Sequence, residues 1–495
     1  MSSISSTVDG LVSGLNTTSI INSLVSADAA TQTRLKSTVS TAQLKVAGYQ
    51  SVNTKMTALQ TAAEALQKAT AWSPVKATSS NEAVTVTTDS KAGSGSLTVN
   101  VVKLASARTA VSEEFALTDG KVDPSTLSYP LDVVKSDGSY VTLKPNTGTL
   151  DQVAAAINEA GQFGIKAVAI RVSDNKYRLQ ITSTDSGSKG DFKLVPHTGS
   201  GRPEGTVATP GKITFAPGDY AALSTVEKAQ GIDELSPAQD AEITIGKTNP
   251  ITVTSSSNSF KDVMPGVSLA VTKEASSVTV GVTSNPEAIA SAMQSLVDAA
   301  NAALSDITLQ TRPGAVGADG KVTGGGTLKG DSALRALKAQ IVDAVTSAVG
   351  GNSSAATFGL QIDKTKATTS NIGLSFDKAK FLEAHAKDPV GVQALVSGAS
   401  LPAPKVGEPA RPDGIVERIA RVAKSATDSV TGTITSAISG QNSSIGDLTK
   451  RIADWDTRLA DKRAYYQKYY GALEVALGKL QSQSTWMAGQ LAGLG

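Results

Sequence analysis

The stretch from Ile445 to Met487 constrains the fold of this chain more than any other. Its seam residues recur at alternating steps of three and four over about six heptads, with polar residues between them and no proline. The seam runs through Ile445, Leu448, Ile452, Trp455, Leu459, Lys462, Tyr466, Tyr469, Leu473, Ala476, Leu480, Gln483 and Met487. One helix of this extent is roughly 65–75 Å long, so the pattern predicts a rod that packs along a partner.

A matching pattern near the other end of the chain supplies that partner. The same spacing runs through Ile21, Leu24, Asp28, Thr31, Leu35, Thr38, Ala42, Lys45, Tyr49, Val52, Met56, Leu59, Ala63 and Leu66. We therefore predict that the N- and C-terminal segments form one coiled coil, with the remaining residues looped out between them. Three aromatic residues, Tyr465, Tyr470 and Trp486, fall off the seam and are candidates for contact with another subunit.

The residues that we expect to carry this assembly interface come from both seams, with Trp486 added. They are Leu24, Leu35, Tyr49, Val52, Met56, Leu59, Leu66, Ile445, Leu448, Ile452, Trp455, Leu459, Tyr466, Tyr469, Leu473, Leu480 and Trp486.

Several seam positions are polar, which weakens the predicted coiled coil. A buried Leu or Ile contributes roughly 1.5–3 kcal/mol, and each polar seam residue forfeits that contribution. These residues are Asp28, Thr31, Thr38, Lys45, Lys462 and Gln483. We expect a rod that is frayed in the free protein and ordered on assembly. The alternative is a stable intramolecular bundle.

Composition narrows the classes of protein to consider. The chain has 495 residues, enough for several domains, and a net charge of +2, which gives no reason to expect nucleic acid or a membrane as partner. It has no cysteine, so disulfides, thiol nucleophiles and thiolate metal sites are excluded. The first basic residue is Arg34 and residues 1–20 lack an apolar run. We therefore expect no Sec-type signal peptide, and export, if it occurs, by another route.

The order of patterns predicts an α+β multidomain protein. We expect terminal N/C coiled-coil helices, a helical leg domain with a β-hairpin, and inserted β-rich head domains. The predicted parts are a disordered tip and coiled-coil helix in residues 1–70, leg residues 71–104 and 276–440, head residues 105–275, and a C-terminal coiled-coil helix in 441–495. Within the head, residues 129–185 form the clearest strand-rich unit.

Local signals predict where several elements begin and end. Trp72-Ser73-Pro74 ends the first helix, because proline disfavours helix in the residue before it. Asp331 caps a helix, and a helical pair breaks at Asp388-Pro389. Gly440-Gln441-Asn442 is expected to turn the chain into the terminal rod.

No motif for catalysis, a metal or a cofactor stands out. The two histidines, His197 and His385, lie far apart in a polar loop and a predicted helix. The stretch 324–332 resembles a phosphate loop but lacks the Lys-Ser or Lys-Thr pair. Asp119-Gly120 and Asp319-Gly320 lack the alternating acidic ligands of a calcium loop. We therefore expect a protein that is not an enzyme and has no cofactor.

Both ends, and several internal steps, resemble the flagellar hook-associated protein 2 family, the filament cap proteins of bacterial flagella. The opening run is Gly10-Leu11-Val12-Ser13-Gly14-Leu15-Asn16-Thr17, and a second signature runs from Asn258 through Asp262 to Pro265-Gly266-Val267. Leu328-Lys329-Gly330-Asp331-Ser332, the helix around Leu296–Asn301 and the tail at Leu480–Met487 are also similar. The unit 129–185 looks like a small repeat of flagellins, whereas 186–240 matches nothing in the family.

The resemblance implies a structural cap at the distal end of the filament. It implies a homo-oligomeric ring, a pentamer or similar, that guides the folding and insertion of exported flagellin. Implied partners are flagellin, hook-filament junction proteins and a type III export chaperone. The implied location is the extracellular flagellum tip, reached through the flagellar type III system without a cleaved signal peptide. Two alternatives are a tip adhesin that binds host glycans and another axial protein of the hook-filament junction.

Overall fold

The computed structural model divides into two compact units, Met1–Trp72 with Pro286–Gly495 and Ser73–Asn285. We call them the helical unit and the strand unit and describe each by itself. The residues that the structure describes are 13–118, 121–122, 131–143, 150–159, 164–174, 176–196, 211–212, 219–229, 231–318, 320, 322–349, 354–363, 372–398 and 413–492.

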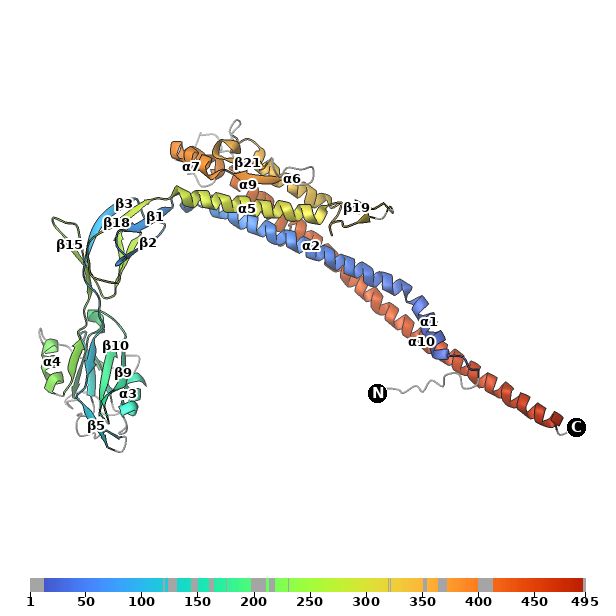
Figure 1. The fold of residues 1–495 in the computed structure, drawn as a ribbon, viewed down its shortest axis with the longest axis horizontal. Helices are drawn as coiled ribbons and strands as arrows, with labels where there is room; N and C mark the ends of the chain where they lie inside the picture. Colours follow the sequence, from blue (N-terminus) through green and yellow to red (C-terminus); the bar gives the residue numbers. More distant parts are fainter. Residues whose placement is uncertain are drawn as a thin grey trace. The chain divides into compact units, whose positions relative to one another are not determined.

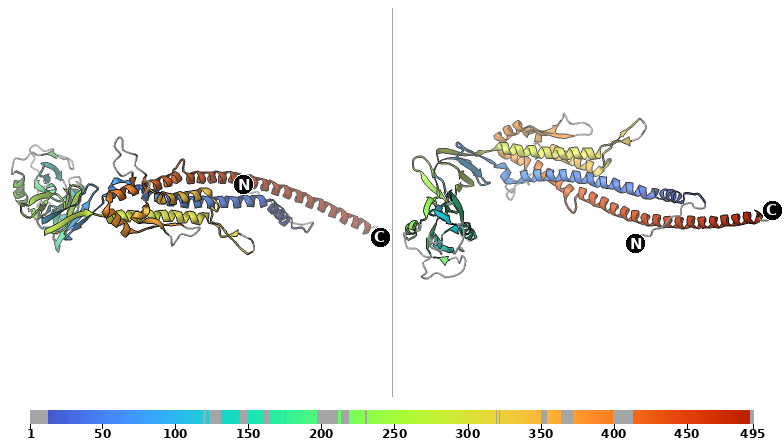
Figure 2. Two further views of the ribbon diagram at one scale, coloured as in Figure 1. Left: turned by 90° about the horizontal axis from the view of Figure 1, so that it is seen from above. Right: turned by 60° about the horizontal axis from the view of Figure 1, so that its bottom comes forward.

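The helical unit contains the long helices expected at both ends of the chain. Its helices are α1 (Thr17–Asp28), α2 (Ala30–Gln67), α5 (Pro286–Thr311), α6 (Ser332–Thr346), α7 (Lys378–Lys387), α8 (Pro389–Val396), α9 (Ile415–Thr427) and α10 (Thr433–Ala492). Two short hairpins join them, β19 (Ala315–Val316) with β20 (Val322–Thr323), and β21 (Leu360–Asp363) with β22 (Gly373–Phe376). Figures 1 and 2 show α2 running between α5 and α10.

Side-chain caps explain several helix boundaries. Asp331 accepts a hydrogen bond from the backbone N–H of Leu334 at 3.0 Å, and Asp388 accepts one from Gly391 at 2.8 Å with Pro389 in the first turn of α8. Trp72 is buried and donates its indole N–H to the carbonyl of Leu66. These caps confirm the predicted helix starts after Asp331 and Asp388.

The turn expected at Gly440-Gln441-Asn442 is wrong. α10 begins at Thr433 and passes through these residues as helix. The turn lies at Asp428 instead, where the carboxylate accepts hydrogen bonds from the backbone of Thr431 and Val430, and these bonds lower the pKa of Asp428. An exposed glycine costs only about 1 kcal/mol inside a helix, so Gly440 alone does not end one.

The strand unit contains the short helices α3 (Leu150–Glu159) and α4 (Asp219–Ala229) between its strands. The strands are β1 (Val75–Ser79), β2 (Val84–Thr88), β3 (Gly95–Lys103), β4 (Thr109–Val111), β5 (Phe115–Thr118), β6 (Lys121–Val122), β7 (Leu131–Lys135), β8 (Ser139–Leu143), β9 (Ile165–Ser173), β10 (Lys176–Ser183), β11 (Phe192–Pro196), β12 (Gly211–Lys212), β13 (Asp233–Ser236), β14 (Ala241–Ile245), β15 (Ile251–Ser255), β16 (Ser259–Met264), β17 (Val267–Val271) and β18 (Ala275–Ser284).

These strands enclose two main apolar cores. One core lies between a sheet in the order β1-β18-β3-β14-β15 and a sheet in the order β16-β17-β2. The other lies among α3, the sheet β13-β4-β10-β5-β6 with β9, and the sheet β11-β7-β8-β12. On β9 the buried side chains are Ile165 and Ala167, whereas Val168 and Val172 are exposed.

The strand pairing differs from the expected domain boundaries. Residues 71–104 and 276–284 were assigned to the helical leg. In the structure β1 and β3 both pair with β18, and β3 also pairs with β14, so nearly all of these residues belong to the strand unit. The hairpin pattern in the sequence identified the strands but contained no information about their partners, which are about 150 to 200 residues away.

A buried charged cluster holds α4 on the second core. Arg108 is 1% exposed and forms two hydrogen bonds with Glu227 of α4, at 3.1 and 2.7 Å. Glu227 also accepts a hydrogen bond from the backbone N–H of Leu194, and Glu234 accepts one from Arg108 at 3.1 Å. α4 is therefore held by these polar contacts as well as by the apolar contacts of Tyr220 and Leu223.

Candidate assembly interface

The two halves of α2 have different surroundings. From Val52 to Leu66 its apolar side chains are fully buried in the core of the helical unit, together with residues of α5, α6 and α9. The predicted interface residues Val52, Met56, Leu59 and Leu66 therefore pack against these helices. The sequence pattern identified a buried face correctly, but its partners in this half are mainly α5 and α9 rather than the terminal rod alone.

Tyr49 stands at the transition between the halves. Its hydroxyl donates a hydrogen bond to Asp331, the residue that caps α6. Burial, with this hydrogen bond and the charge of Asp331, raises the pKa of Tyr49 to about 12. Tyr49 therefore ties α2 to the start of α6.

Toward its N-terminus, α2 and then α1 pack against α10 and form the terminal rod. Leu35 is buried there, and Ile445, Leu448, Ile452, Trp455, Leu459 and Tyr466 are half-buried on α10. Half-burial is expected where two helices pack without further neighbours on their flanks. This is the part of the predicted coiled coil that the structure brings together.

Polar seam residues in the rod bind each other across it. Lys462 forms an ion pair with Asp28 at 2.6 Å, and this hydrogen bond raises the pKa of Lys462. Gln32 is 5% exposed and donates to the carboxylate of Asp456 and, at 3.4 Å, to the carbonyl of Ile452. A polar residue of this kind in a coiled-coil seam specifies register at a cost in stability. The sequence pattern placed Thr31 in the seam and did not identify Gln32.

The seam changes phase where α1 replaces α2. Thr17, Ile21 and Val25 are the buried residues of α1, at steps of four, and Leu24 is 36% exposed. On α10 the half-buried positions after Tyr466 are Tyr470, Glu474, Leu477 and Gly478. The exposed residues of the predicted interface are Leu24 and, on α10, Tyr469, Leu473, Leu480 and Trp486. Assigning Tyr469 to the seam and Tyr470 outside it was therefore wrong.

The helical repeat explains this shift. A straight α-helix has 3.6 residues per turn, so a strict seven-residue pattern drifts by about 20° per heptad. The same one-residue offset already separates buried Gln32 from Thr31 within α2, and the buried residues of α1 then follow at steps of four. Ser13, where the described part of the N-terminal segment begins, donates to Glu474 of α10 through its backbone N–H at 3.3 Å and through its hydroxyl.

Beyond this contact the end of α10 presents an apolar surface. Val475, Leu480, Trp486, Met487 and Leu491 are all exposed, with Trp486 at 66%. Tyr465 and Tyr469, one turn apart, stack on each other at 6.4 Å on an exposed face. We name residues 475–492 the free end of α10.

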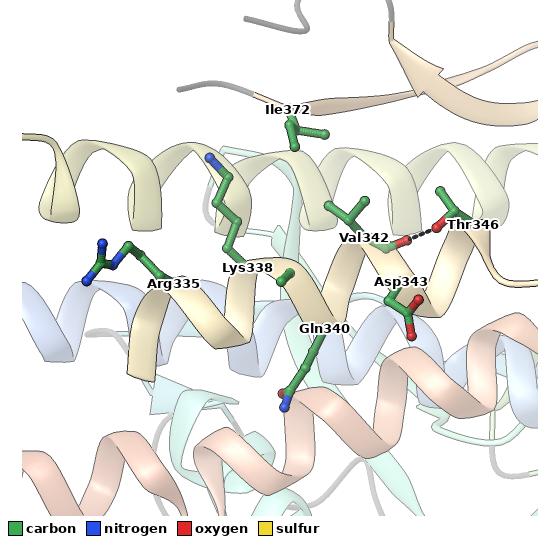
Figure 3. Close-up of a pocket in the computed structure, with 8 residues that line it drawn as sticks. Arg335, Lys338, Gln340, Val342, Asp343, Thr346 and Ile372 are labelled. Carbon is green, nitrogen blue, oxygen red and sulfur yellow. Dashed lines mark hydrogen bonds between the residues drawn. The ribbon is translucent and has the colours of Figure 1, made fainter. Parts of the chain in front are cut away.

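A hollow also lies on the surface of α6. It has a volume of about 640 Å³ and is lined by Arg335, Lys338, Gln340, Val342, Asp343 and Ile372 among others. Figure 3 shows these polar side chains pointing in different directions. Lys338 donates to Thr308 at 2.8 Å and its burial lowers its pKa. The lining does not assemble a catalytic arrangement.

Fold and interface together define a structural chain whose two ends pair into a helical rod and whose middle forms strand-rich domains. Residues 13–108 match the family model described as flagellar hook-associated protein 2 N-terminus, and residues 238–482 match the model of its C-terminus. The chain belongs to the flagellar hook-associated protein 2 family, and it is a structural protein of the bacterial flagellum.

Individual relatives agree along most of the chain. The flagellar hook-associated protein 2 of Escherichia coli K12 is 28% identical, with 99% of this chain and 98% of the relative covered. The B-type protein of Pseudomonas aeruginosa is 26% identical, with 89% and 90% covered. The solved D1-D2-D3 domains of the E. coli flagellar cap protein FliD match the fold with a TM-score of 0.55 at 23% identity, covering 80% of this chain and 99% of that structure.

The family-like steps in the sequence have structural roles. Asn258 bonds through its side chain to both backbone groups of Ala105, at 2.7 and 3.3 Å, and Asp262 accepts from the N–H of Gly266. Asn301 bonds in the same two-fold way to the backbone of Leu374 on β22. Asn258 and Asn301 each fasten segments that are distant in sequence, whereas Asp262 holds a local turn.

Proposed function

We propose that this chain is the cap at the distal end of the flagellar filament, where several copies form a ring. The observation that carries the proposal is the pairing of both chain ends into one rod with an exposed apolar end, in a member of this family. Exposed apolar residues on a helix mark a surface that binds another protein. The copy number is expected to be five or close to it.

The free end of α10 is the part that docks on the filament. In the ring, the gaps between neighbouring copies admit each newly exported flagellin, which folds and inserts there. No nucleotide is consumed in this scheme, and the chain acts as a scaffold and has no enzymatic role. The polar seam of the rod suits this task, because its contacts are weak enough to release and form again as the tip advances.

The other proposed partners follow from the location. Hook-filament junction proteins contact the cap before the filament grows, and a type III export chaperone binds the chain before its passage through the flagellar export channel. Export requires no cleaved signal peptide in this scheme. In the part of the chain that the structure describes, no helix combines the length and apolar character needed to cross a membrane. The relatives named above support a cap over a junction protein, and we see no observation that favours a glycan-binding adhesin.

Deletion of the gene in a flagellated cell tests the proposal. Cells without this chain should release flagellin into the medium and form no filaments, and the full-length chain should restore filament growth. Trp486→Asp, which adds charge to the free end of α10, should reduce filament length strongly. Lys479→Ala, an exposed change on the same segment, serves as the matched control.

Normal filaments in the deleted strain would refute the cap role. Normal filaments with Trp486→Asp would instead refute the role of the free end of α10 and leave the cap role standing. Light scattering of the purified chain adds an independent measurement, because a cap predicts a mass of several copies at high concentration. Shortened chains for this comparison should be made by removing residues 1–28 and 475–495 only. A longer deletion that removed Val52 to Leu66 would take away part of the core.

A further inference from the structure

In the described part of the strand unit, one sheet ends in two strands that are each hydrogen-bonded to a single neighbouring strand. In the order β1-β18-β3-β14-β15, the outer strands are β1 and β15, both five residues long. Each pairs with its neighbour in continuous register without a bulge. β15 contains no charged residue and no proline, and β1 contains one charge, Lys76. Charges, prolines and bulges are among the usual means of blocking such edges, and β15 has none of them while β1 has only Lys76.

Hydrogen bonds within the sheet show which backbone groups of β15 and β1 face its outer edges. Gly246 donates to the carbonyl of Thr98 on β3 at 3.0 Å, and alternation along β14 and β15 then leaves the N–H and C=O of Thr252 and Thr254 at the outer edge. Ser80 donates to Thr279 on β18 at 3.0 Å, so Ala77 and Ser79 face the opposite outer edge. Within the described part of the chain, no backbone hydrogen bond uses these outward groups.

The two edges match in a particular orientation. On β15 the outward groups belong to Thr252 and Thr254, whose side chains lie on the face opposite Val253, which packs on the core. On β1 the outward groups alternate with Lys76 and Thr78, which are exposed. In a parallel ladder, a residue whose N–H and C=O bond to the neighbouring strand lies opposite a residue of that strand whose N–H and C=O point the other way. Parallel pairing of β15 with β1 therefore keeps the core faces of both sheets on the same side.

Side chains beside the edges also fit this pairing. Ile251 lies on the core side of β15 yet is 66% exposed, because no strand covers it. Beside β1 a hollow of about 440 Å³ opens toward β2, lined by Ala77, Val84 and Val86 among others. In the parallel arrangement Ile251 of one copy lies on the side of this hollow in the next copy.

We propose that β15 of one copy adds in parallel to β1 of the next copy and so joins neighbouring strand units edge to edge. The contact uses two different surfaces, and such heterologous contacts close into rings when the rotation between copies allows it. The inference rests on the proposed ring and specifies one of its joints.

Proline substitution at outward positions tests this joint. Thr254→Pro and Ser79→Pro each remove an N–H that the folded sheet does not use, and prolines are tolerated at such edge positions. Each should weaken self-association of the full chain by about tenfold or more, since a strand ladder is interrupted. Thr254→Ala and Ser79→Ala keep the N–H and should associate like the wild type. Light scattering or sedimentation against concentration gives the measurement.

Mixing the two proline variants separates the possible geometries. Thr254→Pro retains an intact β1 edge and Ser79→Pro an intact β15 edge, so an equal mixture should form two-copy species through one joint. Either variant alone should not form this joint. If Thr254→Pro alone associates like the wild type, the β15 edge is not used and the proposal is overturned. The same holds for Ser79→Pro and the β1 edge.

A third variant leaves the backbone unchanged and therefore tests the joint even if a proline variant fails to fold. Ile251→Lys places a charge at the joint without touching any ladder hydrogen bond, and it should weaken association while the circular dichroism spectrum stays unchanged. If the wild type assembles and all three variants assemble equally well, the joint is wrong and the ring stands. If the wild type remains a monomer at every concentration, the ring and the joint fail together.

Discussion

The two halves of α2 belong to one continuous helix, yet they are held by different forces. From Val52 to Leu66 the helix is enclosed by apolar side chains of several helices, whereas toward its N-terminus it pairs with α10, where buried Leu35 lies beside the polar contact of Gln32 with Asp456. The C-terminal half, from Val52 to Leu66, can supply the stability of the folded subunit. The N-terminal half has less apolar burial, so it can open without unfolding the rest. One helix thus combines a stable anchor with an adaptable rod.

The largest expected effect on stability comes from removing a buried side chain between Val52 and Leu66. Met56→Ala removes a fully buried side chain and should lower the free energy of unfolding of the helical unit by about 2–5 kcal/mol. Urea unfolding followed by the helical circular dichroism signal measures it. Leu35→Ala makes a similar change in the rod and should leave that unfolding midpoint nearly unchanged, with faster hydrogen exchange confined to the rod. Equal loss in both variants would remove the distinction between the halves.

The next effect lies at the transition between the halves. Tyr49→Phe removes the hydrogen bond to Asp331 and should cost roughly 1.5 kcal/mol, the usual range for a bond to a charged group. The native state holds the Tyr49 proton to about pH 12, above the ordinary value near 10. The contribution is therefore complete below about pH 10 and is lost as pH rises toward 12. The wild type should lose this stability over that range, and Tyr49→Phe should not.

A gain in stability is expected within the rod. Gln32→Leu replaces a buried amide by an apolar side chain and frees the exposed Asp456 to bind water, so the rod should gain about 1 kcal/mol. Slower hydrogen exchange around Ile452 would record it. Gln43→Leu, at an exposed position of α2, is the control and should not change exchange. A destabilised Gln32→Leu rod would mean that Gln32 stabilises the pairing and does more than specify its register.

The smallest effect concerns the ion pair between Asp28 and Lys462. Exposed ion pairs are weakened by salt, because ions screen charges over about 10 Å at 0.1 M. Protection of the rod against hydrogen exchange should fall slightly with added salt in the wild type, and this dependence should be smaller in Asp28→Asn. The pair raises the pKa of Lys462, so its contribution persists below about pH 10 and is lost at higher pH. An unchanged salt dependence in Asp28→Asn would assign the effect to other charges.

Local chemistry made much of the fold predictable. Asp331 and Asp388 mark helix starts because their side chains cap the first turn. The alternation of Val84 and Val86 likewise indicates a strand in the sequence. The heptads also identified both rod helices, because spacing records which face is buried. Spacing does not record what covers that face, and it did not reveal that Val52 to Leu66 meet α5 and α9.

The interface was less predictable than the fold. The choice between Leu24 and Val25, or between Tyr469 and Tyr470, depends on the helical rotation accumulated along each helix. The sequence pattern cannot decide which of two neighbouring residues faces the partner helix when both have apolar or aromatic side chains. The edge strands β1 and β15 were likewise recognisable as strands only, since their position in the sheet depends on distant partners.

The contact between Ser13 and Glu474 has a consequence for the order of folding. These residues are 461 positions apart in the chain. A chain that emerges N-terminus first has completed nearly its whole length before the two helices of the rod can meet. Closing so long a loop is slow and entropically costly compared with local structure formation. The rod is therefore the last part to form, and until then α1 and the N-terminal part of α2 lack their partner helix α10.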